Sequence, residues 1–102
     1  MFDFNKAMEL KKKMEEMKTR LDAISVDGVA GDGKYQVTVT VSGSKEVKNI
    51  DISAALIENG DKEYIEDLVL TAITRAMDQA QKISEAEARS MALQGGFPGL
   101  GF

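Results

Sequence analysis

The sequence has no cysteine, histidine or tryptophan, and it contains a single proline. Without cysteine, disulfide bonds and thiolate metal sites are excluded. Without histidine, the chain lacks the commonest general base, proton shuttle and metal ligand. The serine and threonine hydroxyls therefore have no obvious base to activate them. We expect a binding protein rather than an enzyme, with no cofactor, no metal and no small-molecule substrate.

Long apolar runs are missing as well. No stretch is long enough to cross a membrane, and no signal peptide opens the chain, so a cytoplasmic location is expected. A length of 102 residues favours one domain. The core of so short a chain is small, and forming a dimer is a common way to enlarge it.

The charge of the chain is unevenly distributed. The net charge is −4, whereas proteins that bind nucleic acid are typically basic. Residues 1–50 nevertheless carry nine Lys and Arg against eight Asp and Glu, while residues 51–102 carry four against nine. The placement of the cations therefore matters more than the sum.

Residues from about Phe4 to Ile24 are predicted to form a helix. This segment has no glycine or proline and is rich in Met, Glu, Lys and Leu, which favour helices. Its apolar residues alternate at spacings of three and four, the pattern of a heptad seam. The seam consists of Ala7, Leu10, Met14, Met17, Leu21 and Ile24.

Cations flank this seam on both sides. With Ala7 at heptad position a, the g positions hold Lys6, Lys13 and Arg20, and the e positions hold Lys11 and Lys18. Symmetric pairing of this helix with itself would set lysine against lysine, which disfavours such pairing. We expect the seam to pack on the sheet or on a different helix. The lysines at its edges are then left for acids of the last helix or for phosphates.

Three short strands are predicted next. The first covers residues 25–30, and the Asp-Gly step at residues 31–33 predicts a hairpin turn. Apolar and polar residues alternate over residues 35–42, which predicts a strand with one buried and one solvated face. Residues 47–52 form the third strand, where the opposite parity of Val47 indicates a bulge or a start at Lys48.

The remainder of the chain is predicted to be helical up to about Leu93. Ser53 is expected to cap a single helical turn through Leu56 and Ile57, and Asp61 is expected to cap the last helix. That helix carries one apolar stripe. Its members are Ile65, Leu68, Val69, Ala72, Ile73, Ala76, Ala80 and Ile83.

The predicted fold class is therefore α+β. A long N-terminal helix, a three-stranded antiparallel sheet and a long C-terminal helix follow one another in the order α-β-β-β-α. Residues 1–94 are expected to form a single domain. Residues 95–102, which are rich in glycine, are expected to form a flexible tail.

Several segments together resemble the YbaB/EbfC family of nucleoid-associated proteins. The string from Gly43 to Ile52, preceded by Val-Thr-Val at residues 37–39, resembles the central signature of that family. The start of the last helix at residues 64–69, the Met- and Lys-rich opening helix and the Gly-rich tail are also similar. The chain departs from the family in Asp32, which interrupts the Gly-rich turn, and in Ile52-Ser53, where members have Asp-Pro.

The resemblance implies a tweezer-shaped homodimer whose helices project as arms and which binds DNA with modest sequence specificity in the bacterial nucleoid. The positions of the charges, independently of the family, suggest that two sets of cations contact phosphates. The first helix supplies Lys11, Lys12, Lys13, Lys18 and Arg20, and the last helix supplies Arg75, Lys82 and Arg89, spaced by seven.

Two alternatives remain open from the sequence. A row of charges on a helix is usually a solvated face stabilised by pairs four residues apart. The chain could also be a protein-interaction or adaptor dimer, whose acidic second half engages a basic partner and which does not bind nucleic acid directly.

Overall fold

The computed structural model describes residues 3–93, and its elements follow the predicted order. They are α1 (Phe4–Ala23), β1 (Ser25–Asp32), β2 (Tyr35–Ser42), β3 (Val47–Ile52), α2 (Ala54–Asn59) and α3 (Lys62–Leu93). The strands form one antiparallel sheet in the order β1-β2-β3. The α+β class is thus confirmed. The expected tail and its boundary at residue 94 lie outside the described residues.

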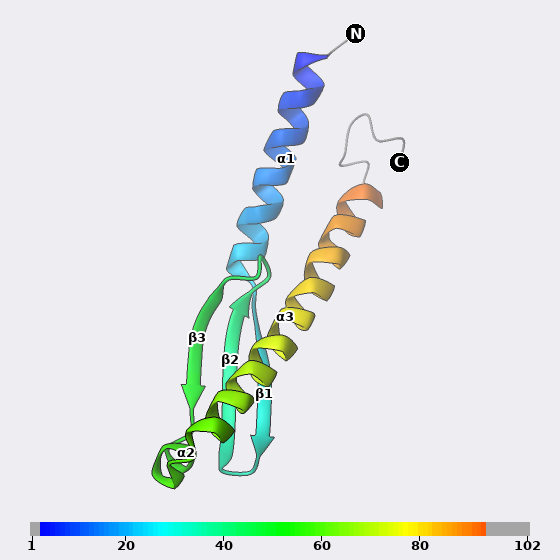
Figure 1. Ribbon diagram of the computed structural model, residues 1–102. Coiled ribbons are helices and arrows are strands. Elements are labelled where there is room, and N and C mark those ends of the chain that lie inside the picture. The colour runs from blue at the N-terminus through cyan, green and yellow to red at the C-terminus, as the bar shows by residue number, and fades with distance from the viewer. Residues whose placement is uncertain (1–2, 94–102) are drawn as a thin grey trace.

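The core lies between one face of the sheet and helix α3, which crosses that face diagonally (Figure 1). Val37, Val39 and Val41 alternate along β2 and are fully buried. Opposite them, α3 presents the small residues Ala72, Ala76 and Ala80, all with 0% exposure. Because alanines add little thickness, the axis of α3 comes close to β1 and β2.

The β1–β2 hairpin is tighter than the sequence predicted. Strand β1 runs on to Asp32, which pairs with Tyr35, so Gly33 and Lys34 form the turn. Gly33 has a φ of +55°, as the first central residue of a two-residue hairpin requires. The predicted turn at residues 31–33 was therefore displaced, because Gly31 continues the ladder opposite Gln36.

The predicted irregularity of β3 is a bulge. Thr40 pairs with Asn49 and Val41 pairs with Val47, so Lys48 is the extra residue. Val47 consequently shares the face of Ile50 and Ile52 despite its opposite parity.

The caps of the last two helices follow the prediction only in part. Asp61 caps α3 as expected, since its Oδ1 accepts the Tyr64 N–H at 3.1 Å. Ser53 precedes α2, but its hydroxyl makes no capping bond. It accepts the Gln36 N–H at 3.3 Å and thereby ties α2 to β2.

Helix α1 projects beyond the sheet, and the chain spans 64 × 19 × 19 Å (Figure 1). The C-terminal end of α1 is held in place because the Gly43 N–H donates to the carbonyl oxygens of Leu21 and Ile24. Leu21 is 4% exposed, whereas Met14 is 53% exposed. The expectation that the seam packs against the sheet or another helix therefore holds at its lower end and fails at Met14.

None of the helices within residues 3–93 is both long and apolar enough to cross a membrane. Across the same residues, no group of three or more Asp or Glu side chains is placed to hold a metal ion.

Candidate nucleic-acid interface

Three consecutive lysines lie near the middle of the projecting helix. Asp3 starts this helix by accepting the N–H groups of Asn5 and Lys6, and the next three turns carry no glycine or proline. Lys11 and Lys12 are exposed and Lys13 is half-buried. Among residues 3–93, none of the three forms an ion pair. Their charges remain available to an external anion.

Lys18 has an internal partner. Its Nζ lies 2.9 Å from Asp22 Oδ2, one turn further along α1. The hydrogen bond and charge of Asp22 raise the pKa of Lys18. In turn, the Ser44 hydroxyl and then Lys18 lower the pKa of Asp22. The Lys18 side chain remains 65% exposed, so a phosphate could still reach it.

Arg20 connects the two long helices. Its Nε lies 2.5 Å from Oε1 of Glu87 on α3. An acid of the last helix was one of the two partners expected for the cations beside the seam, and it is the partner found here. Arg20 is therefore a weaker candidate for phosphate contact than the three lysines above it.

The three cations spaced by seven along α3 differ in their partners: Arg75 is held by a hydrogen bond, whereas Lys82 and Arg89 form no ion pair within residues 3–93. Nη1 of Arg75 donates to the carbonyl oxygen of Val29 on β1 at 2.7 Å, which fixes the guanidinium without neutralising its charge. Lys82 and Arg89 are exposed. Neither forms an ion pair within the described part of the chain.

A polar cluster at the base of α1 was not predicted. The Ser44 hydroxyl donates to Asp22, a second hydrogen bond joins Ser44 to the buried Ser42, and the Lys48 amine donates to the Asp22 carbonyl oxygen at 2.9 Å. Lys48 and Asp22 are separated by 26 positions in the sequence. Because no local pattern links them, only the return of the β2–β3 turn to α1 reveals the cluster.

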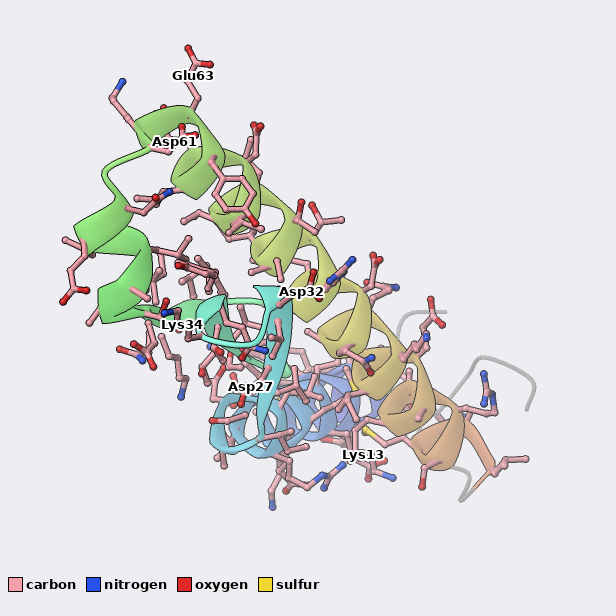
Figure 2. All side chains as sticks on the ribbon, turned by 90° about the horizontal axis from the view of Figure 1, so that it is seen from below. Lys13, Asp27, Asp32, Lys34, Asp61 and Glu63 are labelled. Carbon is pink, nitrogen blue, oxygen red and sulfur yellow. The ribbon has the colours of Figure 1, made fainter. Side chains whose placement is uncertain are left out.

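A group of acids lies at the other end of the molecule, although α1 itself also carries Glu9, Glu15 and Glu16. Asp61 and Glu63 project at the start of α3, on the far side of the view from Lys13 (Figure 2). The exposed carboxylates of this acidic corner are Glu58, Asp61, Glu63, Glu66 and Asp67. The acids of this corner therefore do not cancel the positive charge of the α1 lysines, because exposed charges further apart than about 10 Å are largely screened.

Comparisons with known proteins identify relatives that match most of the chain. A "Nucleoid-associated protein" of Nitrobacter winogradskyi is 40% identical over 99 residues, which cover 94% of this chain and 90% of the relative. A protein of the same description from Chloroflexus aurantiacus is 37% identical over 94 residues, covering 92% and 90% of the two chains.

The fold also has a counterpart among solved structures. The crystal structure of an uncharacterized protein from Helicobacter pylori superposes with a TM-score of 0.65 at 21% identity, covering 80% of this chain and 93% of that one. The sequence profile of the YbaB/EbfC DNA-binding family matches residues 2–96. With nearly its whole length matched, the chain belongs to the YbaB/EbfC DNA-binding family.

Proposed function

We propose that this protein binds double-stranded DNA in the bacterial nucleoid as a non-enzymatic homodimer. It contacts mainly the phosphate backbone and has low sequence specificity. The observation that carries the proposal is the set of Lys11, Lys12 and Lys13, whose ammonium groups have no carboxylate partner among residues 3–93. The family, together with relatives named nucleoid-associated proteins, supports the same role.

The contacts are assigned by charge and exposure. Lys11, Lys12 and Lys13 contact phosphates first, and Lys18 contributes by exchanging Asp22 for a phosphate. Arg20 contributes least because it already pairs with Glu87. Lys82 and Arg89 extend the interface along α3, and Arg75 adds a fixed positive charge beside β1. Each neutralised phosphate releases condensed counterions, which makes the affinity depend on salt.

The low sequence specificity follows from the kind of residues involved. Lysines on an exposed helix reach backbone oxygens, and such contacts position a protein without reading the base sequence. Most of the cations proposed here are lysines, which act as point charges and lack the fork geometry for bidentate recognition of guanine.

The dimer is proposed from apolar surface that one chain leaves uncovered. Helix α3 packs on β1 and β2. Ile50 and Val47 of β3 share the face that α3 covers elsewhere, yet they remain 45% and 46% exposed. A second copy seated on this face would bury them and enlarge a small core. The tweezer shape expected of the family requires such a pair of arms.

The test is a gel shift with double-stranded DNA at several salt concentrations. A dimer that makes six to ten phosphate contacts loses about 10³-fold or more in affinity between 50 and 200 mM salt. The Lys11→Glu, Lys13→Glu and Lys18→Glu triple variant is expected to abolish the shift.

The matched control changes three exposed lysines elsewhere, Lys34→Glu, Lys45→Glu and Lys62→Glu. It alters the net charge by the same amount but leaves α1 intact, so most of the binding should remain. If both triple variants lost the same amount of DNA affinity, the loss would be due to the change in net charge and not to the lysines of α1. Absence of any shift at low salt, combined with co-purification of a basic protein, would instead favour the adaptor function of the acidic corner.

A further inference from the structure

The C-terminal end of α1 has backbone carbonyl oxygens that find no partner inside the helix, as every α-helix does. Here the segment that follows β2 supplies the missing donors. The Gly43 N–H donates to a carbonyl oxygen in the last turn of α1 at 3.0 Å, and the Lys48 ammonium group donates to that of Asp22 at 2.9 Å. The Ser44 hydroxyl adds a hydrogen bond to the Asp22 carboxylate. We refer to residues 43–48, which hold the end of the helix, as the socket of α1.

The bulge in β3 explains how Lys48 reaches this position. Lys48 is the extra residue of the strand, because Asn49 pairs with Thr40 while Val47 pairs with the neighbouring Val41. In a regular strand Lys48 would alternate with Asn49 and lie on the apolar face of the sheet. A bulge takes one residue out of the alternation and re-aims its side chain. The Lys48 amine therefore reaches the end of α1, where a cation also interacts favourably with the helix dipole.

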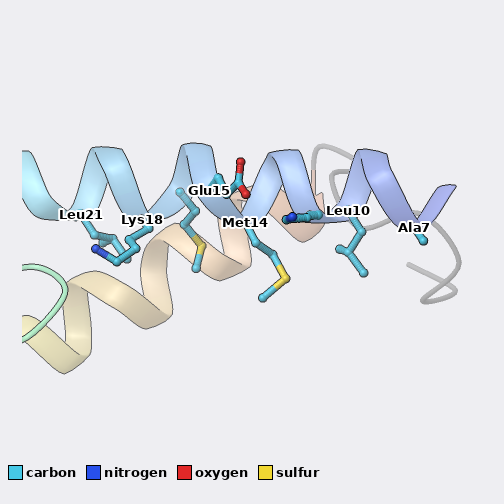
Figure 3. Close-up of a pocket in the computed structure, with 8 residues that line it drawn as sticks. Ala7, Leu10, Met14, Glu15, Lys18 and Leu21 are labelled. Atoms are coloured by element: carbon cyan, nitrogen blue, oxygen red, sulfur yellow. The ribbon is translucent and has the colours of Figure 1, made fainter. Parts of the chain in front are cut away.

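The outer part of α1 has little else to fix its direction. Residues 5–19 form no hydrogen bond or ion pair with another element of the described chain. Figure 3 shows Leu10 and Met14 projecting from one side of this part of the helix, and Met14 is 53% exposed. The other polar attachment of α1 is the Arg20–Glu87 pair, whose arginine side chain is 50% exposed. Exposed pairs of this kind contribute little.

A small tilt at the socket is amplified along the helix. Lys11 lies eleven residues before Asp22, which corresponds to about 16 Å of helix. At that length, a tilt of about 10° at the base displaces Lys11 by about 3 Å. Such a displacement is comparable with the length of a hydrogen bond. The contacts made by the socket therefore decide where the lysines of α1 project.

We propose that Lys48 and Ser44 are positioning residues for DNA binding, which hold the end of α1 and set the direction of its lysines without contacting DNA themselves. This inference rests on the proposed DNA-binding function. The Ser44 hydroxyl already donates to Asp22, and it forms a second hydrogen bond of 2.9 Å with the fully buried Ser42, which keeps it in place. Lys48 acts from the base of the helix, whereas the proposed phosphate contacts of α1 lie further out.

DNA binding at several salt concentrations separates positioning from direct contact. In Lys48→Met, the DNA affinity at a fixed salt concentration should fall about threefold to tenfold, because the productive direction of α1 is populated less. The slope of log K against log salt should stay unchanged. If Lys48 contacted a phosphate in each chain of the dimer, the slope would instead fall by about 1.8, close to 0.9 for each lost contact. A fall of that size would overturn the assignment.

Two further variants serve as controls for charge. Lys48→Arg keeps a charged donor at the end of α1 and should bind DNA as the natural protein does. Lys45→Met removes the same charge three positions earlier, from an exposed side chain that forms no ion pair within residues 3–93, and should leave the affinity nearly unchanged. Equal losses in Lys45→Met and Lys48→Met would assign the effect to charge and contradict positioning.

The direction of α1 can also be measured without DNA. The natural chain has no cysteine, so spin labels can be attached at Glu9→Cys on α1 and Gln79→Cys on α3, both of which are exposed positions. Labelled chain diluted with an excess of unlabelled chain reports the distance between the labels within one chain. The distribution of this distance should broaden in Lys48→Met and in Ser44→Ala, and it should stay narrow in Lys45→Met.

This second measurement distinguishes failure of the inference from failure of the proposed function. Distance distributions that stay narrow in Lys48→Met and in Ser44→Ala would refute a positioning role, even if the natural protein binds DNA. If the natural protein gives no gel shift at low salt, the proposed function fails, while the distances still decide whether these two residues hold α1. Circular dichroism of each variant verifies that its helices and strands are retained.

Discussion

At the scale of single residues, Gly28 decides how closely the helix and sheet approach. A Cβ built on Gly28 would lie 2.2 Å from the carbonyl oxygen of Ala72 and 2.3 Å from the nitrogen of Ala76. Both are backbone atoms of α3, which cannot rotate away as a side chain would. The residue is therefore required by packing, although its position inside a strand offers no turn that would explain it.

Gly28→Ala is expected to destabilise the fold by roughly 1–3 kcal/mol or more, because α3 must shift outward from β1. Urea denaturation followed by circular dichroism measures the change. The control is Gly60→Asn, because Gly60 has a φ of +71° and a Cβ added there would meet no atom within 4 Å. Asparagine tolerates that conformation at a helix end. A Gly28→Ala loss as small as that of the control would show that α3 can move freely.

Asp22 is the residue whose ionisation should affect the base of α1. Its pKa is lowered by the Ser44 hydroxyl and by Lys18. A carboxyl group whose pKa is lower in the folded state than in the unfolded state stabilises the fold at pH values above its unfolded-state pKa. That stabilisation is lost as the pH falls through the folded-state pKa. The stability difference between the natural protein and Asp22→Asn should therefore be constant at neutral pH and shrink below pH 3.8, the ordinary pKa of this carboxyl group. Denaturation at a series of pH values measures it, and a difference that grows towards low pH would contradict the assignment.

At the scale of elements, the two helices contribute unequally to the proposed interface. Helix α1 carries four lysines without a carboxylate partner among residues 3–93, three of which belong to the proposed interface, while α3 carries two such cations and the anchored Arg75. Helix α3 must also cover the sheet, so its apolar stripe limits the width of its charged face. Helix α1 is free of that role over most of its length.

Lys82→Gln/Arg89→Gln is expected to weaken DNA binding less than the triple variant of α1. If both cations contact phosphates in each chain of the dimer, four contacts are lost and the slope of log K against log salt falls by about 3.6, close to 0.9 for each lost contact. The control Thr74→Glu/Gln81→Glu lowers the net charge equally from positions off the cation row. Identical slopes for the natural protein and Lys82→Gln/Arg89→Gln would remove α3 from the interface.

At the scale of the whole molecule, the elongated shape separates the charges. The acidic corner lies at the start of α3, and α1 carries its lysines away from the sheet (Figures 1 and 2). A polyanion can thus approach one end of an acidic protein. The uncovered face of β3 lies between these ends and is the surface proposed for the second copy.

Ile50→Lys is expected to weaken the proposed dimer by at least about 100-fold, since burying an unpaired ammonium group costs several kcal/mol. Light scattering over a range of concentrations measures the mass. Val29→Lys is the control, because Val29 is similarly exposed at 41% but lies on the opposite face of the sheet. A dimer unaffected by Ile50→Lys would place the interface elsewhere.

Most of the architecture follows from local sequence patterns. The heptad spacing of the first helix, the alternation at residues 35–42 and the parity change at Val47 each depend on neighbouring residues, and the structure confirms all three. The turn at Gly33-Lys34 was misplaced by about two residues because the Asp-Gly step does not by itself define where pairing stops. The lysines on α1 were identified from their heptad positions, although which of them are neutralised was not.

The tertiary structure decided what depends on contacts between distant segments. Arg20 meets Glu87 across 67 residues, and Lys48 meets Asp22 across 26. The close approach at Gly28 also arises only once α3 has settled on the sheet. Periodicity reports which side chains share a face of one element. It carries no information on which face of another element they will meet, because that depends on how the elements pack in three dimensions.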